Sequence, residues 1–349
     1  MPVIAVHTDF VADVVETQAR HGTAAMATHH LKALRTGGID CICEHVIGDT
    51  FEALCFPTER IVGALRPDQP YAPSSLKHGL HLLASFLRDV EQCEGRLRIA
   101  TTAADIRECA DEGVLAVVLC FQGTNPVEGD PILLDVFYRL GIRILGITTN
   151  HDNAAGRSQV GRNGGLTQIG NTLVARANEL GMVVDVSHLS DHGIRDVLEI
   201  ASGPIIASNS NTRRHHDIPR NLSDEMIERI AASGGIVGVH ANGDLITHAR
   251  PVTLDHWADH VFHIVDLVGI DHAAIGPDLV DETMYPAERY RSLMAGRDHF
   301  HAPYPQGLET HADLPRFTDV LQRRGINDDG IAKVLGGNAL RVFETVWGR

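Results

Sequence analysis

Short apolar runs alternate along this chain with amphipathic stretches, a pattern that predicts a parallel sheet with helical crossovers. The runs typical of buried strands cover residues 3–7, 39–46, 97–100, 115–120, 142–147, 182–187, 204–207, 235–240 and 272–276. Between them, apolar residues recur at helical spacing, with glycine near the end of several stretches, over residues 27–38, 167–181 and 223–235. Ser223, followed by Glu225 and Met226, marks the start of one helix.

About eight strand-helix units follow one another without a break in composition, which favours a closed (β/α)8 TIM-like barrel over an open sheet. We therefore expect an α/β protein with a single barrel domain over residues 1–349. The segment after the strand at 272–276 is rich in Tyr, His and Arg, and barrels often extend their loops at such strand ends. It predicts a lid insertion at about 279–314.

Polar residues follow the predicted strands at the end where such barrels carry their chemistry. These residues are His7, Asp9, Gln122, His188, Asn209, His240 and Asp278. Residues i and i+2 of a strand share a face, so the imidazole of His7 and the carboxylate of Asp9 point together and suit an ion such as Zn²⁺. Two polar residues after one strand are common by chance, but six strand ends in register favour a functional site over simple solvation.

Composition and charge limit the kinds of partner that this chain is expected to have. With 44% hydrophobic residues, no run of eighteen apolar residues and no basic leader, the chain is expected to be soluble and cytoplasmic, without a membrane partner. A net charge of −15 with scattered arginines argues against nucleic acid. The six cysteines contain no CxxC pair and are expected to be reduced core residues: Cys41, Cys43, Cys55, Cys93, Cys109 and Cys120. The 21 histidines are about twice the usual number.

Longer motifs carry a resemblance that covers nearly the whole chain. They are HTDF (7–10), YRLGIRILGITTN (138–150), GLTQIGNTLVARANELGMVVDVSHLSD (165–191), DIPRNLSDEM (217–226), HIVDLVGIDHAAIGPD (263–278) and VLGGNALRVF (334–343). The chain thereby resembles the renal (membrane) dipeptidases, zinc peptidases of the amidohydrolase superfamily. The resemblance implies a barrel of the metal-dependent hydrolase type, a homodimer, and two zinc ions that share a bridging glutamate and activate a water against a dipeptide amide.

Matched to the family's motifs, several residues take on expected roles. His7 and Asp9 correspond to ligands of the first metal, and His188 to a ligand of the second. Arg220 corresponds to the arginine that binds the substrate carboxylate, and Asp278 to the aspartate that handles the proton of the water.

Three positions depart from the family pattern. Gln122 stands where the family has its bridging glutamate, and Asn209 where it has a second histidine. Thr149 stands where the family has the histidine that steadies the substrate, with His151 two residues further on. A neutral amide bridges two cations poorly, since it lacks the charge and the second acceptor oxygen of a carboxylate.

These departures predict one zinc ion rather than two, with a four-point ligand set of His7, Asp9, His188 and Asp278. Asp278 would also act as general base. Gln122, Asn209 and Thr149 would join Arg220 in contacting the substrate.

Two further residues are catalytic candidates. His240 is compatible with a replacement ligand, a general acid or a substrate contact, and equally with a strand-terminal histidine bonded to backbone. His151 has a suitable position but matches no family motif.

The sequence thus predicts a metal-dependent hydrolase of a dipeptide or another small amide with a carboxylate. Two alternatives stay open. One is a metal-poor isomerase or lyase of a tailoring pathway, in which Asp278 and His240 exchange protons with the substrate. The other is a non-catalytic binding protein, which is less favoured because buried polar groups without an ion or proton partner are costly.

Overall fold

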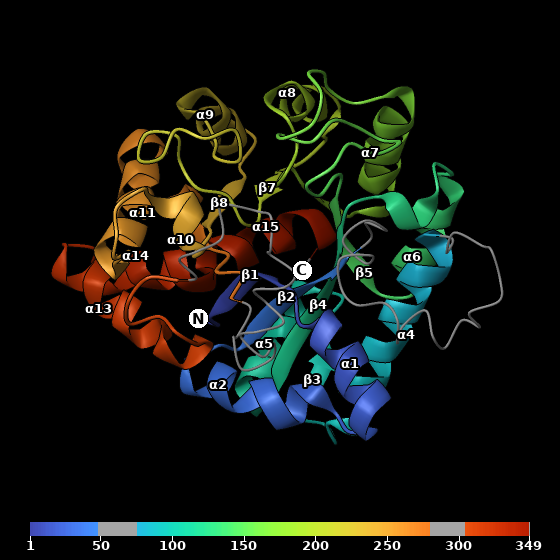
Figure 1. Ribbon diagram of the computed structural model, residues 1–349, viewed down its shortest axis with the longest axis horizontal. Helices are drawn as coiled ribbons and strands as arrows, with labels where there is room; N and C mark the ends of the chain where they lie inside the picture. The colour runs from blue at the N-terminus through green and yellow to red at the C-terminus, as the bar shows by residue number, and fades with distance from the viewer. Residues whose placement is uncertain (48–74, 280–303, 349) are drawn as a thin grey trace.

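The computed structural model describes residues 1–47, 75–279 and 304–348, and its strands form a parallel barrel surrounded by helices (Figure 1). Eight strands are neighbours in the order β1-β2-β4-β5-β6-β7-β8-β9. Their bounds are β1 Ile4–Thr8, β2 Cys41–Ile47, β4 Leu115–Gln122, β5 Ile142–Gly146, β6 Val183–Asp185, β7 Ile206–Ala207, β8 Ile236–Val239 and β9 Ala273–Ile275. The (β/α)8 barrel expected from the sequence is confirmed.

A ninth strand, β3 (Leu97–Ile99), lies outside this path. It pairs with the first residues of β4, beginning at Leu115, whereas β5 pairs with β4 from Leu119 onward. Each of the nine runs predicted as strands therefore overlaps an observed strand, but β3 lies outside the eight strands of the barrel.

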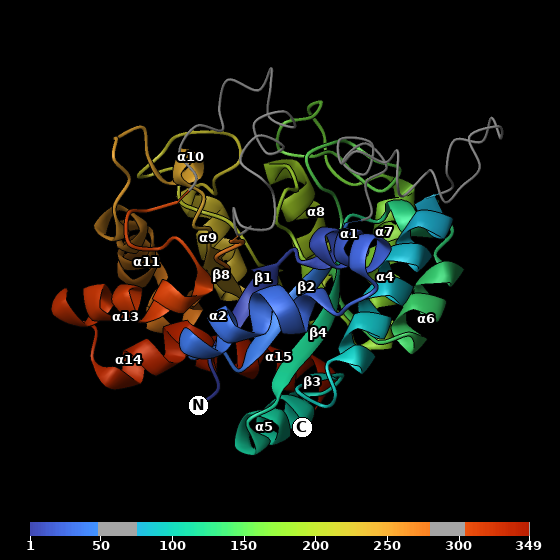
Figure 2. The same cartoon turned by 60° about the horizontal axis from the view of Figure 1, so that its bottom comes forward.

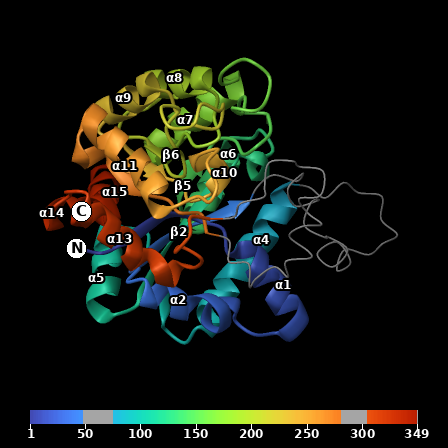
Figure 3. The same ribbon diagram turned by 60° about the vertical axis from the view of Figure 1, so that its left-hand side comes forward.

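Helices cover the outside of the barrel, as Figures 2 and 3 show from two further sides. They are α1 Val11–His21, α2 Leu31–Thr36, α4 Ser75–Gln92, α5 Ala103–Glu112, α6 Ile132–Arg139, α7 Gln168–Leu180, α8 Asp191–Ile200, α9 Asp224–Ala232, α10 Gly243–Ile246, α11 Leu254–Val268, α13 Leu314–Arg323, α14 Asp328–Ala332 and α15 Asn338–Trp347. A π-helical turn, Met26–His30, leads into α2. Ser223 caps α9 by accepting the N–H of Met226, as the sequence predicted.

The apolar core has two parts, which follow from the alternation of side chains along the strands. One part contains alternate strand residues that face the barrel axis, among them Ile4, Cys43, Val118 and Ile236, together with Phe343 of α15. The other part lies between the strands and the outer helices. Figure 2 shows α5 and α15 together at one end of the barrel, and the carboxyl ends of the strands lie at the opposite end.

Five of the six cysteines are buried and carry free thiols, and Cys55 lies outside the described residues. Most of the expected lid, residues 280–303, also lies outside them. Within the described parts, no helix combines the length and apolarity needed to cross a bilayer.

Candidate metal centre

The candidate site continues the rows of side chains that face the barrel axis. On six strands or just beyond them, a polar residue stands two positions after an inward-facing small or apolar one. These polar residues are His45, Gln122, Asp185, Ser208, His240 and Asp278. On β1 the pairing register with β2 shifts between Ala5 and Thr8, and His7 stacks inward on His45.

Ser208 fixes which ring nitrogen of His7 carries the proton. The Ser208 hydroxyl donates its hydrogen to the Asp185 carboxylate, so its oxygen accepts from His7 Nδ1 at 2.8 Å. With the proton on Nδ1, the lone pair of Nε2 faces the mouth of the barrel. Burial, followed by the charge of His45, lowers the pKa of His7 to about 3 and keeps the ring neutral.

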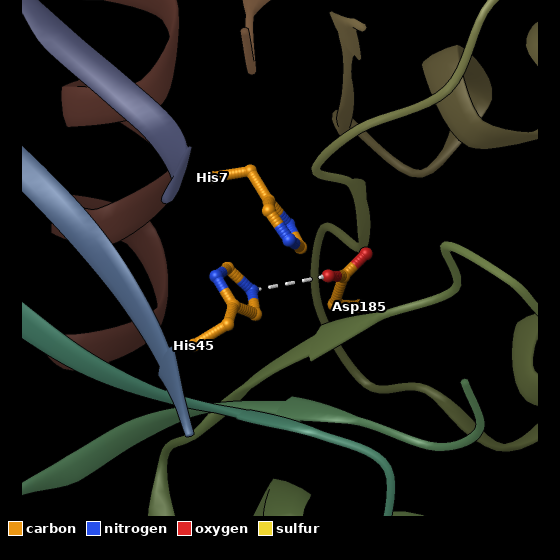
Figure 4. Close-up of side chains that lie close together, drawn as sticks. All are labelled: His7, His45 and Asp185. Atoms are coloured by element: carbon orange, nitrogen blue, oxygen red, sulfur yellow. Dashed lines mark ion pairs between the residues drawn. The ribbon is translucent and has the colours of Figure 1, made fainter. Parts of the chain in front are cut away.

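Behind His7 lies a second imidazole that the sequence predictions missed. The rings of His45 and His7 stack with their centroids 3.7 Å apart, and His45 Nε2 lies 3.5 Å from an Asp185 oxygen (Figure 4). Burial opposes protonation of His45, but the charge of Asp185 outweighs it and raises the pKa of His45. Asp185 also accepts the N–H groups of Ser187 and Ser208, so this buried carboxylate is fully engaged.

Three donor atoms converge in front of His7. Its Nε2 lies 3.7 Å from Asp9 Oδ1 and 3.9 Å from Asp278 Oδ2, and the three atoms lie within 4.8 Å of one another. Asp9 Oδ1 is buried and has no hydrogen-bond partner among the described residues. Burial and the charge of Asp278 raise the pKa of Asp9. Such an orphaned oxygen beside an imidazole lone pair and a second carboxylate fits a divalent cation of the zinc type.

Asp278 is held by neighbours on two strands. Its Oδ2 accepts from Asn209 Nδ2 at 3.0 Å and lies 3.2 Å from His240 Nε2. His240 Nδ1 accepts the N–H of Asn242, which places the ring proton on Nε2, toward Asp278. Burial opposes ionisation of Asp278, but the neighbouring His7 and His240 and the hydrogen bonds outweigh it and lower its pKa.

On the other side of the mouth, an amide joins two imidazoles. Gln122 Nε2 lies 3.4 Å from Nε2 of His7 and 3.4 Å from Nε2 of His188. Because His188 Nδ1 faces the amide oxygen of Asn150 at 3.1 Å, its Nε2 also presents a lone pair. The NH₂ group of Gln122 can therefore donate one hydrogen to each ring, and a cation bound by His7 Nε2 would replace the first of these bonds.

Arg220 fills the remaining space beside His188. One guanidinium nitrogen lies 3.1 Å from His188 Nε2 and 2.7 Å from Oδ1 of Asn209. It also donates to the Asn209 carbonyl, and the other terminal nitrogen donates to Ser210. Burial lowers the pKa of Arg220 to about 10, so it stays charged at neutral pH. A cation thus already occupies the neighbourhood of His188 and Asn209.

The backbone is strained at two of these residues. His188 and Asp278 have φ of +66° and +49°, in the left-handed region that residues with a Cβ rarely adopt. Of the described non-glycine residues, the others with positive φ are Glu94 and Glu128. Strain of this kind concentrates at functional sites, because the surrounding structure must hold it there.

The predicted site residues therefore separate into groups. His7, Asp9 and Asp278 converge, and His240 lies against Asp278, whereas His188, the fourth expected ligand, faces Gln122 and Arg220 instead. Thr149 is buried beside Gly123, and His151 is exposed on the loop after β5.

The sequence predictions missed His45, Asp185, Ser208 and Asn150. The first three could have been found from the alternation of side chains along a strand, in which every second residue faces the same side. His45 follows Cys41 and Cys43, Asp185 follows Val183, and Ser208 follows Ile206 on the same inward face.

Comparisons with known proteins agree on one family. The family described as membrane dipeptidase (peptidase family M19) matches residues 1–347. An uncharacterized protein in the pqqA 5′ region of Klebsiella pneumoniae is 31% identical over 279 residues, which are 76% of this chain and 94% of that protein. Dipeptidase verJ of Clonostachys rogersoniana is 30% identical over 260 residues, 74% of this chain. The match spans only 62% of verJ.

Solved structures share the fold. An amidohydrolase from Pseudomonas aeruginosa superposes with a TM-score of 0.80 at 23% identity, over 100% of this chain and 97% of that one. A metallopeptidase from Rhodobacter sphaeroides, liganded with a phosphinate mimic of the dipeptide L-Ala-D-Ala, gives a TM-score of 0.82 at 22% identity, over 99% of both chains.

Proposed function

Because this chain belongs to the membrane dipeptidase family, peptidase family M19, and is thus a dipeptidase-family amidohydrolase, we propose that it cleaves a small amide with a single divalent ion. Family membership confirms the resemblance drawn from the sequence motifs. The observation that supports the single ion is that the polar residues at the carboxyl ends of the barrel strands form two groups. Ligand atoms of His7, Asp9 and Asp278 converge, and Asp9 Oδ1 has no hydrogen-bond partner among the described residues, whereas His188 Nε2 and Asn209 Oδ1 face the donor groups of Gln122 and Arg220.

The residues that would hold the ion are His7, Asp9 and Asp278, with zinc as the expected metal. A bound zinc supplies Lewis acidity and lowers the pKa of a coordinated water to about 7. The chain itself supplies orientation, since Ser208 and Asp185 hold His7 in the tautomer whose Nε2 lone pair faces the ion site.

Asp278 and His240 are placed to handle protons. Asp278 is ionised, and His240 presents its Nε2 hydrogen to it while Asn242 holds the other ring nitrogen. Asp278 therefore serves as the acceptor of the proton from the attacking water, and His240 and Asn209 keep its carboxylate in place.

Arg220 is the group for the substrate carboxylate. It is buried, charged and fixed by Ser210, Asn209 and His188. A guanidinium fixed in this way binds a carboxylate with little loss of conformational entropy. We therefore expect dipeptides or acylated amino acids, whose free carboxylate lies within a few bonds of the scissile amide.

The ion count is tested by two matched alanine variants. His7→Ala should lose one zinc equivalent relative to the wild-type chain, whereas His188→Ala should retain the wild-type amount, measured by elemental analysis after dialysis. A shared pair of ions predicts loss in both variants, and that result would overturn the single-ion proposal. Turnover of a dipeptide panel that includes Ala-Ala, with and without chelator, tests the activity.

A proton-transfer enzyme is the second candidate. Asp9 and Asp278 lie together in front of His7, and burial with the charge of Asp278 raises the pKa of Asp9 while His7 and His240 lower that of Asp278, so the two carboxyl groups differ in their tendency to hold a proton. An isomerase or lyase uses such a pair without hydrolysis. Its activity would persist after exhaustive chelation, whereas the hydrolase should lose turnover and regain it with zinc.

The expected homodimer stays a prediction, which analytical ultracentrifugation would test. The expected cytoplasmic location also stays a prediction, which cell fractionation would test.

A further inference from the structure

A second cluster of metal-ligating side chains lies apart from the residues of the candidate metal centre. His29 Nδ1 lies 2.9 Å, and His30 Nε2 2.8 Å, from the same oxygen of Asp13. The two imidazole rings are nearly perpendicular, so they approach this oxygen from different directions. Asp13 belongs to the first turn of α1, and both histidines belong to the π-helical turn Met26–His30. Helical turns of this π type are rare and recur at functional sites.

The cluster contains a buried negative charge. The side chain of Asp13 is 6% exposed, and burial opposes its ionisation, yet the bonds from His30 and His29 lower its pKa. Among the described side chains, these two histidines are its ion-pair partners. A buried carboxylate requires a positive charge nearby, which neutral imidazoles lack. A proton on one imidazole or a metal ion bound by all three groups would supply it.

The donor chemistry and the access favour a metal. Two imidazole nitrogens and one carboxylate oxygen form the ligand set of many zinc sites, with water as the fourth ligand. Ligand atoms about 2.0–2.1 Å from a tetrahedral ion lie about 3.3 Å apart, roughly 0.4 Å more than the separations here. The His29 side chain is 37% exposed, which gives it room for this movement and leaves one side open to solvent.

Neighbouring groups hold the other two ligands in place. Thr17 donates to Asp13 Oδ1, the oxygen that the histidines leave free, at 3.3 Å. The ring of Phe10 packs on His30 with the centroids 4.4 Å apart. Asp89 accepts the N–H groups of Ala25 and Met26 and so fixes the start of the π-helical turn. Ordered ligands of this kind reduce the entropy lost when an ion binds.

We propose that Asp13, His29 and His30 form a second metal site, for Zn²⁺ or a similar imidazole-binding divalent ion. The ion clips the first turn of α1 to the turn that precedes α2, two segments of the same edge of the molecule (Figure 3). Because α1 begins two residues after Asp9, the clip also steadies the loop that carries this residue of the candidate metal centre. The role is structural, and no step of the reaction depends on it.

The test measures zinc bound at equilibrium by the full-length chain at micromolar free zinc. His29→Ala and Asp13→Asn should each bind one equivalent less than the wild type, and His21→Ala, an exposed histidine at the end of α1, should bind the wild-type amount. Far-UV circular dichroism shows that each variant is folded. If Asp13→Asn does not fold, the zinc content of His29→Ala alone tests the proposal, because His29 is exposed and its replacement should leave the fold intact.

Variants that combine changes at both sites distinguish this proposal from the single-ion proposal for the candidate metal centre. His7→Ala should lose one equivalent and His7→Ala with His29→Ala should lose two, whereas the zinc-induced rise in melting temperature should shrink with His29→Ala in either background. Equal zinc in the wild type, His29→Ala and Asp13→Asn would overturn the second site whatever His7→Ala shows. Loss of zinc in His21→Ala as well would indicate unspecific surface binding and would overturn it too.

Discussion

At the scale of single residues, the candidate metal centre depends on groups that never face the substrate. Ser208 and Asp185 decide which nitrogen of His7 carries its proton, and Asn150 does the same for His188. An imidazole with the wrong tautomer presents N–H to a cation and cannot bind it. These buried partners therefore contribute to metal affinity in addition to the ligands themselves.

Ser208→Ala should weaken zinc binding at His7 by about 10–100-fold, the usual effect of losing an outer-shell partner. The change leaves His7 Nδ1 without its acceptor and Asp185 without a donor. Competition with a chromophoric chelator measures the dissociation constant. Ser202→Ala, at an exposed serine ahead of the same strand, is the matched control and should keep the wild-type affinity. An unchanged constant in Ser208→Ala would show that the tautomer is set elsewhere.

Gln122→Glu combined with Asn209→His should add a second ion to the mouth. The glutamate supplies the missing bridging charge, and the histidine replaces an amide whose oxygen now accepts from Arg220. Elemental analysis should give one zinc equivalent more than the wild type. Gln122→Asn is the control, because it changes the side chain without adding charge. No gain in the double variant would mean that Arg220 excludes the second ion by itself.

The sequence predicted site residues where a polar side chain stands at the end of a strand or just after it. His7, Asp9, His240 and Asp278 were found in this way and lie together. His45 was missed because it lies in a run that otherwise suggests a core of cysteines, and its role depends on stacking against His7. The pairing of Arg220 with His188 and Asn209 could not be predicted either, since it depends on how two loops fold back.

At the scale of elements, α5 shows how charge and backbone define a helix start. Thr102 accepts the N–H of Asp105, while Asp105 accepts the N–H groups of Thr101 and Thr102. Burial opposes ionisation of Asp105, but these bonds lower its pKa. A carboxylate at this position also interacts favourably with the helix dipole.

Asp105→Asn should lower the free energy of unfolding by about 0.5 kcal/mol at pH 7. Since the folded pKa lies below the unfolded value of about 3.9, the stabilisation is complete above roughly pH 5 and is lost as the pH falls through the folded pKa. Urea titrations at pH 7 and pH 3 should therefore show a smaller difference from the wild type at pH 3. Glu108→Gln, an exposed position in the same helix, should change little at either pH. A difference that grew toward pH 3 would contradict this account.

Element types were predictable from periodicity, and their pairing was less so. The strand expected at 182–187 ends early, at Asp185, because the residues after it turn to form the site, and the strand expected at 204–207 begins late, at Ile206. The stretch 27–38 begins as a π-helical turn rather than an α-helix. Hydrophobic spacing does not distinguish the two, and here bonds from Asp89 hold the turn.

At the scale of the whole molecule, the interior of the barrel joins strands that are distant along the chain. Inward-facing residues from all eight strands of the barrel belong to a single apolar cluster, which Phe343 of α15 enters from the end opposite the metal centre. Glycine permits the closest approach, because a Cβ at Gly276 would collide with the carbonyl oxygen of Ser208. The packing that closes the barrel therefore also positions Asp278, which stands two residues after Gly276, and α15 contributes to this packing through Phe343.

Phe343→Ala should destabilise the barrel as one unit. Phe343 is fully buried and stacks on Trp347 with ring centroids 4.3 Å apart, so its removal leaves a cavity that costs about 3–5 kcal/mol. Tryptophan fluorescence and far-UV circular dichroism should report a single transition, shifted equally to lower urea, because the cluster spans the sheet. Glu344→Gln, which removes only a partly exposed ion pair with Arg107, should cost less than about 1 kcal/mol. If instead fluorescence moved first and the dichroism stayed, α15 would be a separable cap, and the barrel would close without it.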